Sequence, residues 1–148
     1  MKQLRLFDNK EDDPEVSLEI KIEKLNIIEV GLDLLGERIK KSKEGNYYKG
    51  LCPFHYEKTP SFYLRKKYNR YVCFGCQTSG KPIELIFELS YSTYAINLDN
   101  KYFPEIIDPI KYLNKKIGFD KYNKKHLETL KEILSFQNNC KDIIDSFL

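Results

Sequence analysis

Four residues that commonly bind metal stand in two short pairs, Cys52 with His55 and Cys73 with Cys76. The complete pattern is C-x2-H-x17-C-x2-C. Two intervening residues let both side chains of a pair converge on one ion, and a longer insert can join the pairs as a hairpin. Three sulfurs and one nitrogen fill a tetrahedron and leave no position for a catalytic water. We therefore expect one structural Zn²⁺ ion, bound by these four residues.

Two alternatives to zinc are a redox-active Cys73-x-x-Cys76 pair and unrelated core cysteines. A thioredoxin-like pair requires a βαβ context, whereas the residues around this pair have the pattern of β-hairpins. The second pair at the same spacing favours zinc over both alternatives. Two similar residues lie outside the cluster. Cys140 is expected to be a free thiol on a helix, and His126 is expected on a helix surface.

Charge is unevenly distributed along the 148 residues. Residues 36–81 carry 11 basic and 3 acidic side chains, a net charge of +8, whereas residues 1–35 carry −4 and residues 82–148 carry −1. The basic segment also contains the four candidate ligands, so a polyanionic partner is expected there. No apolar run approaches the roughly 20 residues of a membrane span, and no secretory signal begins the sequence. We expect a cytoplasmic chain without a membrane partner, whose cysteines stay reduced.

The hydrophobic pattern predicts an α+β fold, a small zinc ribbon with an antiparallel β-sheet flanked by helices, followed by C-terminal helices. One helical stripe runs over 18–35 and ends at Gly36. Strands are expected between residues 46 and 72, with a hairpin turn over 66–69. Further helices are expected over 83–89, over 109–117 with Gly118 at the end, and around Leu127, Leu130 and Leu134.

Two segments, CPFHYEKTPSF (52–62) and YVCFGCQTSG (71–80), closely resemble the N-terminal zinc-binding domain of bacterial DnaG-type DNA primases. The family pattern reads CPFHxEKTPSF, then CFGCGxxG, and a looser likeness covers about residues 18–120. The resemblance implies the same four zinc ligands. This chain departs from the family at Gln77, where Gly is usual, and at Lys81, where Asp or Asn is usual. Each ligand pair is expected on a tight turn, called a knuckle, over residues 52–55 and 73–76. Gly adopts a positive φ at little cost, so Gln77 in its place is expected to affect the geometry of the second knuckle.

The resemblance also suggests a division into domains. We expect a flexible acidic leader over 1–16, a primase-type zinc-binding domain over 17–103 and a C-terminal helical extension over 104–148. Primases of this type continue into a catalytic domain that binds divalent metal through a glutamate and a D-x-D pair. This sequence contains no D-x-D. We therefore expect no catalytic residues, and no primer synthesis by this chain alone.

Cations and aromatic residues alternate through the basic segment. Cations can follow a phosphate backbone while rings stack on unpaired bases, and the resemblance implies contact with a single-stranded DNA template. The alternatives are that the rings form the core and that the lysines form a solvated face. Tyr63, Tyr68 and Tyr71 are expected to be exposed. The predicted DNA-binding residues are Lys58, Tyr63, Arg65, Lys66, Lys67, Tyr68, Arg70 and Tyr71.

The N-terminus holds a second recognisable pattern. Gln3, Leu4, Leu6 and Phe7 resemble the motif QLxLF, with which bacterial replication proteins bind the sliding clamp. Adjacent apolar side chains on a disordered peptide can fill one hydrophobic pocket. Three hypotheses follow: a zinc-dependent DNA-binding module of replication and priming, an adaptor that docks on replication proteins, or a truncated primase. The partners these hypotheses imply are single-stranded DNA, the sliding clamp, the replicative helicase in a primosome and a separate primase catalytic chain.

Overall fold

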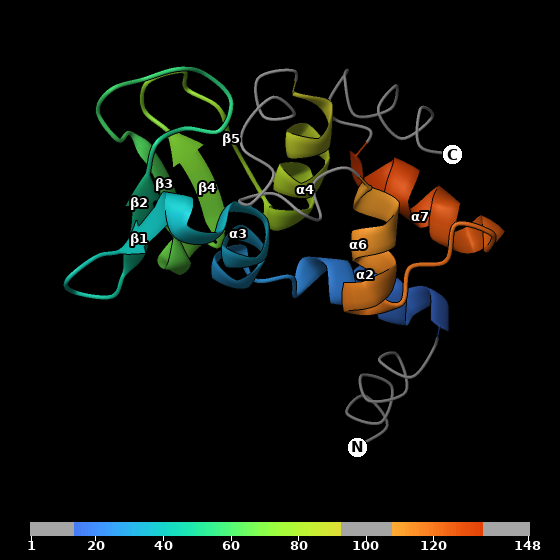
Figure 1. Cartoon of the computed structure of the whole chain (residues 1–148). Coiled ribbons are helices and arrows are strands. Elements are labelled where there is room, and N and C mark those ends of the chain that lie inside the picture. Colours follow the sequence, from blue (N-terminus) through green and yellow to red (C-terminus); the bar gives the residue numbers. More distant parts are fainter. Residues whose placement is uncertain (1–13, 93–107, 135–148) are drawn as a thin grey trace. The chain divides into compact units, whose positions relative to one another are not determined.

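The computed structural model describes residues 14–92 and 108–134 (Figure 1). They belong to two compact units, which are described separately. The unit that contains the candidate metal ligands is Leu25–Pro109, and the other comprises the residues up to Lys24 and from Ile110 onwards. Within the described ranges, no helix combines the length and the apolar character needed to cross a bilayer.

An antiparallel sheet forms the centre of the first unit. Its strands follow one another in space as they do in sequence: β1 (Ile39–Lys41), β2 (Tyr47–Gly50), β3 (Phe62–Arg65), β4 (Arg70–Cys73) and β5 (Ser79–Gly80). The sheet with its helices confirms the predicted α+β fold. The turn predicted over 66–69 is also present, as a short 3₁₀ turn (η2, Lys66–Tyr68) followed by Asn69. Strand β1 lies in the basic stretch, for which the sequence pattern predicts no strand.

Two helices cover one face of the sheet. Helix α3 (Ile27–Leu35) packs against β3 and against α4 (Pro82–Tyr91), which packs against β4. Strand alternation turns Phe62, Leu64 and Tyr71 toward these helices, and each is at most 1% exposed. The helices contribute Val30, Leu34, Leu35, Ile83, Ile86 and Phe87 to this core. The opposite face of the sheet is left for the polar and aromatic side chains described below.

The single helix predicted over 18–35 is wrong, because two helices occupy this range. Helix α2 (Pro14–Glu23) ends before Asn26, whose extended backbone begins α3. The Asn26 side chain accepts hydrogen bonds from the N–H groups of Ile28 at 2.8 Å and Glu29 at 3.1 Å. In a continuous helix these N–H groups would donate to backbone carbonyls of the preceding turn. Here the Asn26 side chain accepts their hydrogen bonds and caps a new helix. The predicted end at Gly36 is confirmed, with a φ of 53°.

The second unit is helical in its described residues. Helix α2 packs against α7 (Lys124–Leu134), and α6 (Pro109–Ile117) precedes α7. Their buried side chains include Leu18, Ile22, Tyr112, Leu113, Phe119, Leu130 and Leu134. Helix α6 ends at Gly118, as predicted, with a φ of 72°. His126 lies on α7 half-buried and accepts a hydrogen bond at Nδ1 from the Asp120 N–H at 3.0 Å, which is a structural role. The prediction for Cys140 lies outside the described residues.

Candidate metal centre and the adjoining sheet face

The sheet register brings the two ligand pairs to the same place. Cys52 follows β2 and Cys73 is the last residue of β4, and both strands pair with β3 at Phe62, through Gly50 on one side and Cys73 on the other. The four ligand atoms of Cys52, His55, Cys73 and Cys76 all lie within 4.8 Å of one another. The structure therefore places together the four residues that the sequence predicts as ligands.

The geometry of this cluster fits a tetrahedral zinc ion. The sulfurs of Cys52 and Cys76 are 3.8 Å apart, and zinc–sulfur bonds of about 2.3 Å at tetrahedral angles give a separation of about 3.8 Å. The Nδ1 atom of His55 is buried and has no hydrogen-bond partner among the described residues, as expected for an atom reserved for a metal. When bound, Zn²⁺ would supply folding energy to this region of the sheet.

Backbone N–H groups support the sulfurs in both knuckles. The Phe54 N–H lies 3.3 Å from Cys52 Sγ, and the Cys76 N–H lies 3.5 Å from Cys73 Sγ. The Gln77 N–H donates to the Cys73 carbonyl at 2.7 Å, and Gln77 has a φ of 64°. The family glycine thus stands at a left-handed position, and this chain places a side chain there at some backbone cost.

Two of the thiols have shifted pKa values. Burial raises the pKa of the Cys52 thiol well above its ordinary value. Burial also acts to raise the pKa of Cys73, but its hydrogen bond with the Ser61 side chain and the one from the Cys76 N–H outweigh burial, and the pKa of Cys73 is lowered. Burial thus favours the protonated thiol at Cys52, and the positive charge of a bound metal ion would help this sulfur to lose its proton.

Sequence reasoning missed Glu57, Ser61 and Gly75, which lie directly beside the ligands. Glu57 accepts hydrogen bonds from the N–H groups of Cys52 and Ser61, each at 2.9 Å. Burial acts to raise the pKa of Glu57, but hydrogen bonds from the Ser61 hydroxyl and these N–H groups hold it below its ordinary value. All three residues stand inside the two quoted motifs, which was the available signal, but spacing alone gives them no role.

Arg38 supports the first knuckle from the other side. Its Nε donates to the Leu51 carbonyl and its Nη2 donates to the Cys52 carbonyl, both at 2.9 Å. Arg38 therefore stabilises the chain at the start of the first knuckle. Its guanidinium has a structural role beside the metal centre and is not part of a phosphate-binding surface. The charge count of the sequence could not separate such a structural cation from a solvent-facing one.

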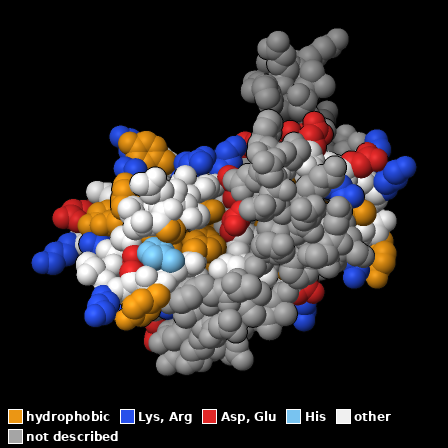
Figure 2. Space-filling view, turned by 90° about the horizontal axis from the view of Figure 1, so that it is seen from above, with side chains coloured by type: hydrophobic (Ala, Val, Ile, Leu, Met, Phe, Trp, Pro, Cys, Tyr) orange, Lys and Arg blue, Asp and Glu red, His pale blue; other side chains and the backbone are white. Residues whose placement is uncertain are grey.

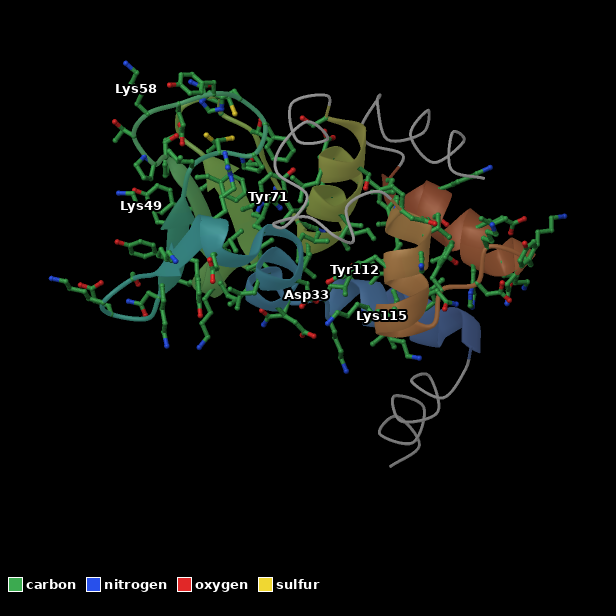
Figure 3. The ribbon with its side chains drawn as sticks, in the orientation of Figure 1. Asp33, Lys49, Lys58, Tyr71, Tyr112 and Lys115 are labelled. Carbon is green, nitrogen blue, oxygen red and sulfur yellow. The ribbon has the colours of Figure 1, made fainter. Side chains whose placement is uncertain are left out.

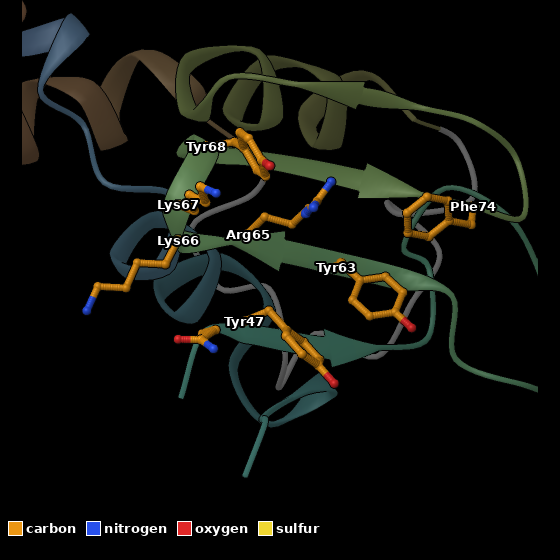
Figure 4. Close-up of a pocket in the computed structure, with 8 residues that line it drawn as sticks. Tyr47, Tyr63, Arg65, Lys66, Lys67, Tyr68 and Phe74 are labelled. Atoms are coloured by element: carbon orange, nitrogen blue, oxygen red, sulfur yellow. The ribbon is translucent and has the colours of Figure 1, made fainter. Parts of the chain in front are cut away.

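The outer face of the sheet carries a groove of about 990 Å³. Figure 4 shows its side chains along one face of β2, β3 and the η2 turn, close to the second knuckle. Five of the predicted DNA-binding residues line it, and three further residues were missed. The predicted ones are Tyr63, Arg65, Lys66, Lys67 and Tyr68, and the missed ones are Asn46, Tyr47 and Phe74.

Rings and cations contact one another along this groove. The Tyr63 ring centroid lies 5.4 Å from those of Tyr47 and Phe74. The Arg65 guanidinium lies 4.5 Å from the centroid of the Tyr68 ring, and Lys49 Nζ lies 5.3 Å from that of Tyr63. Tyr68 is 52% exposed and Phe74 is 63% exposed. In Figure 2, Lys and Arg side chains stand out from the surface with hydrophobic side chains between them.

The predicted exposure of Tyr71 is wrong. Tyr71 pairs with Leu64 on the inner face, is 1% exposed, and its ring stacks on Phe62 with centroids 5.8 Å apart. Its neighbours Arg70 and Val72 take the outer positions, because successive residues of a strand face opposite sides. Figure 3 shows Tyr71 between the sheet and α4, whereas Lys58, on the first knuckle, points away from the body. Lys58 and Arg70 are exposed but do not line the groove.

The N-terminal motif of Gln3, Leu4, Leu6 and Phe7 lies outside the described residues. The partner-binding role predicted for it therefore stays a prediction. The domain boundaries predicted at residues 16 and 103 also stay predictions. The first falls inside helix α2 (Pro14–Glu23), which packs against α7 in one compact unit.

Comparison with known proteins matches residues 17–103 to a family described as the CHC2 zinc finger. A DNA primase of Clostridium acetobutylicum is 34% identical over 121 residues, which are 78% of this chain and 18% of the relative. A DNA primase of Rickettsia prowazekii is 42% identical over 77 residues, which are 50% of this chain and 13% of the relative. The chain thus spans less than a fifth of the length of either relative.

A solved structure supports the fold independently. The crystal structure of the Aquifex aeolicus primase, comprising its zinc-binding and RNA polymerase domains, matches with a TM-score of 0.50 and 22% sequence identity. The match covers 87% of this chain and 31% of that chain. The family match extends over more than half of the sequence and includes all four clustered ligands. The chain therefore belongs to the CHC2 zinc finger family.

Proposed function

We propose that this chain is a zinc-dependent DNA-binding module of DNA replication, which contacts a single-stranded template in priming. The family and the relatives named DNA primase support a primase-like context. Because the chain spans only part of those relatives, their polymerising activity is not proposed for it. The observation that carries the proposal is the groove on the outer sheet face, where exposed rings and cations stand together beside the metal centre.

The groove has the chemistry that a single strand requires. None of its lining residues is acidic, and three of them, Arg65, Lys66 and Lys67, are cations. Phosphate groups attract such cations without regard to sequence. Exposed rings offer faces to unstacked bases, and each base stacked in this way typically contributes about 1–3 kcal/mol. A duplex hides its bases from these rings, so a single strand is the ligand that fits.

The role proposed for zinc is indirect. Phe74 is carried by the second knuckle, and its N–H donates to the Ser61 carbonyl at 3.0 Å. The metal centre thus holds the ring that closes one end of the groove, while the η2 turn carries Tyr68 at the other end. Loss of zinc should release Phe74 from its place beside Tyr63 and weaken binding without removing any cation.

A direct test compares single-stranded and duplex oligonucleotides of one length by fluorescence anisotropy. The zinc-loaded chain should prefer the single strand. Tyr68→Ala and Phe74→Ala should each weaken binding by about 5-fold to 150-fold, which corresponds to roughly 1–3 kcal/mol. Tyr122→Ala is the matched control, because Tyr122 is 86% exposed but belongs to the helical unit. Equal affinity for both DNA forms, or unchanged binding by the two groove variants, would contradict the proposal.

A second candidate function is suggested by the sequence at Gln3–Phe7. We propose that this segment docks on the sliding clamp of the same cell, so that the chain also serves as a replication adaptor. Titration of the clamp with the wild-type chain and with Leu6→Ala/Phe7→Ala tests this role. Binding that is lost in the double variant, with DNA affinity unchanged, would support it, and equal binding by both chains or by neither would end it.

A further inference from the structure

Glu57 lies beside the four ligands of the metal centre without being one of them. Its side chain is 11% exposed. Its Oε2 accepts hydrogen bonds from the N–H groups of Cys52 and Ser61, each at 2.9 Å. Its Oε1 accepts from the Ser61 hydroxyl and lies 3.2 Å from His55 Nε2. Both oxygens are thus occupied by donors, which leaves this carboxylate unsuited to bind the metal itself.

The contact with His55 decides which imidazole nitrogen carries a proton. A carboxylate accepts hydrogen bonds and cannot donate one, so Nε2 must hold the hydrogen in this contact. The lone pair of the neutral ring is then at Nδ1, the buried atom without a hydrogen-bond partner among the described residues. Leaving such a buried acceptor without a partner is unfavourable. A metal ion at the cluster would satisfy it.

Glu57 also connects the first knuckle to the second. Ser61, which it holds at two atoms, has its hydroxyl 3.3 Å from Cys73 Sγ and its carbonyl 3.0 Å from the Phe74 N–H. Gly75, in the second knuckle, lies close to the contact between Glu57 and His55. A Cβ at this position would lie 3.1 Å from Glu57 Oε1 and 3.0 Å from His55 Nε2. One carboxylate therefore contacts the first knuckle directly and is linked to the second through Ser61.

We propose that Glu57 is a positioning residue of the metal centre, which fixes His55 with Nδ1 toward the three sulfurs and ties the two knuckles together. Outer hydrogen-bond partners of this kind orient metal-bound imidazoles, and their substitution typically lowers metal affinity by about 10-fold to 100-fold. Glutamine has the same shape but only one acceptor oxygen. In Glu57→Gln its NH₂ group must face donors on one side, either the two N–H groups or the pair formed by Ser61 Oγ and His55 Nε2.

The test measures zinc affinity of the full chain by competition with a chromophoric chelator. Glu57→Gln should bind zinc about 10-fold to 100-fold more weakly than the wild type, still with one ion per chain. Glu44→Gln, in the exposed turn between β1 and β2, is the matched control and should leave the affinity unchanged. Equal affinity of Glu57→Gln and the control would overturn the proposal.

A second measurement covers the case in which Glu57→Gln fails to fold. The ¹⁵N chemical shifts of the His55 imidazole in the zinc-loaded wild type should show the metal at Nδ1 and a slowly exchanging proton at Nε2. Metal at Nε2, or an Nε2 proton that exchanges as fast as one on a free imidazole, would overturn the proposal. Neither measurement involves DNA, so the result is independent of the proposed function.

Discussion

The side-chain oxygen of Asn69 accepts a hydrogen bond from the backbone N–H of Ile27 at 2.8 Å. The same amide donates from Nδ2 to the Leu25 carbonyl, also at 2.8 Å. Asn69 ends the η2 turn in a left-handed conformation, with φ 50° and ψ 45°. These hydrogen bonds therefore hold the turn that carries Tyr68 against the start of α3, a segment more than 40 residues away in sequence.

Two substitutions of Asn69 should distinguish the stability contributed by its side-chain hydrogen bonds from that contributed by its tolerance of the left-handed backbone conformation. Asn69→Gly keeps the left-handed backbone and loses two hydrogen bonds, at about 0.5–1.5 kcal/mol each. Asn69→Ala loses the same bonds and adds roughly 1–2 kcal/mol of backbone cost. Urea unfolding of the zinc-loaded chain should therefore rank wild type above Asn69→Gly and Asn69→Gly above Asn69→Ala. A change below about 0.5 kcal/mol in both variants would contradict the anchoring role.

Gly75→Ala tests how closely the second knuckle approaches the first. The added methyl would lie 2.9 Å from Ser61 Oγ, 3.0 Å from His55 Nε2 and 3.1 Å from Glu57 Oε1. The imidazole or the carboxylate must shift, so we expect zinc affinity to fall by at least 10-fold. Gly36→Ala is the contrast, because its φ is 53° and open space surrounds it. That variant should lose roughly 1–2 kcal/mol of stability and keep its zinc affinity.

Cys73→Ser should largely unfold residues 46–80. Structural zinc contributes about 10–16 kcal/mol of apparent binding energy, which the apolar residues of this small sheet cannot replace. The freshly purified wild type should contain one zinc per chain by elemental analysis, and the variant should contain much less and lose its β-sheet circular dichroism. Cys140→Ser, outside the cluster, serves as the control. Wild-type protein without tightly bound zinc would contradict this expectation.

The metal ligands could be predicted from sequence because their geometry is local. Two residues between the members of a pair fix how the side chains converge, whatever the rest of the chain does. The same holds for the hairpin turn at Lys66–Tyr68 and for the helix ends at Gly36 and Gly118. In each of these cases the residue types within a few positions decide the local conformation.

The errors arose where strand register, a helix cap or a network of side chains decides the outcome. Tyr63 and Tyr71 look alike in sequence, and only the strand register places one in the groove and the other in the core. Asn26 reads as a tolerable helix residue until its side chain is seen to cap α3. Glu57 counts as one charge in the sequence, and its role depends on Ser61 and His55 folding around it.

Charge reversal in the η2 region is the most direct test of the proposed DNA surface. Arg65, Lys66 and Lys67 all line the groove. Replacing the three with glutamate should weaken binding to a single strand and leave zinc stoichiometry unchanged. Lys21, Lys121 and Lys124, which are exposed in the helical unit, provide a control with the same change in net charge. Their reversal should weaken binding much less, because only long-range attraction is lost.

The salt dependence of single-stranded DNA binding is the measurement that tests the central claim. The logarithm of the association constant should fall linearly with the logarithm of salt concentration, by about 0.7 for each phosphate neutralised. Reversal of Arg65, Lys66 and Lys67 should reduce the magnitude of the slope by about 2, whereas the helical-unit control should keep the wild-type slope. Tight binding that does not respond to salt, or a slope unchanged by the groove reversals, would show that DNA does not bind this face of the sheet.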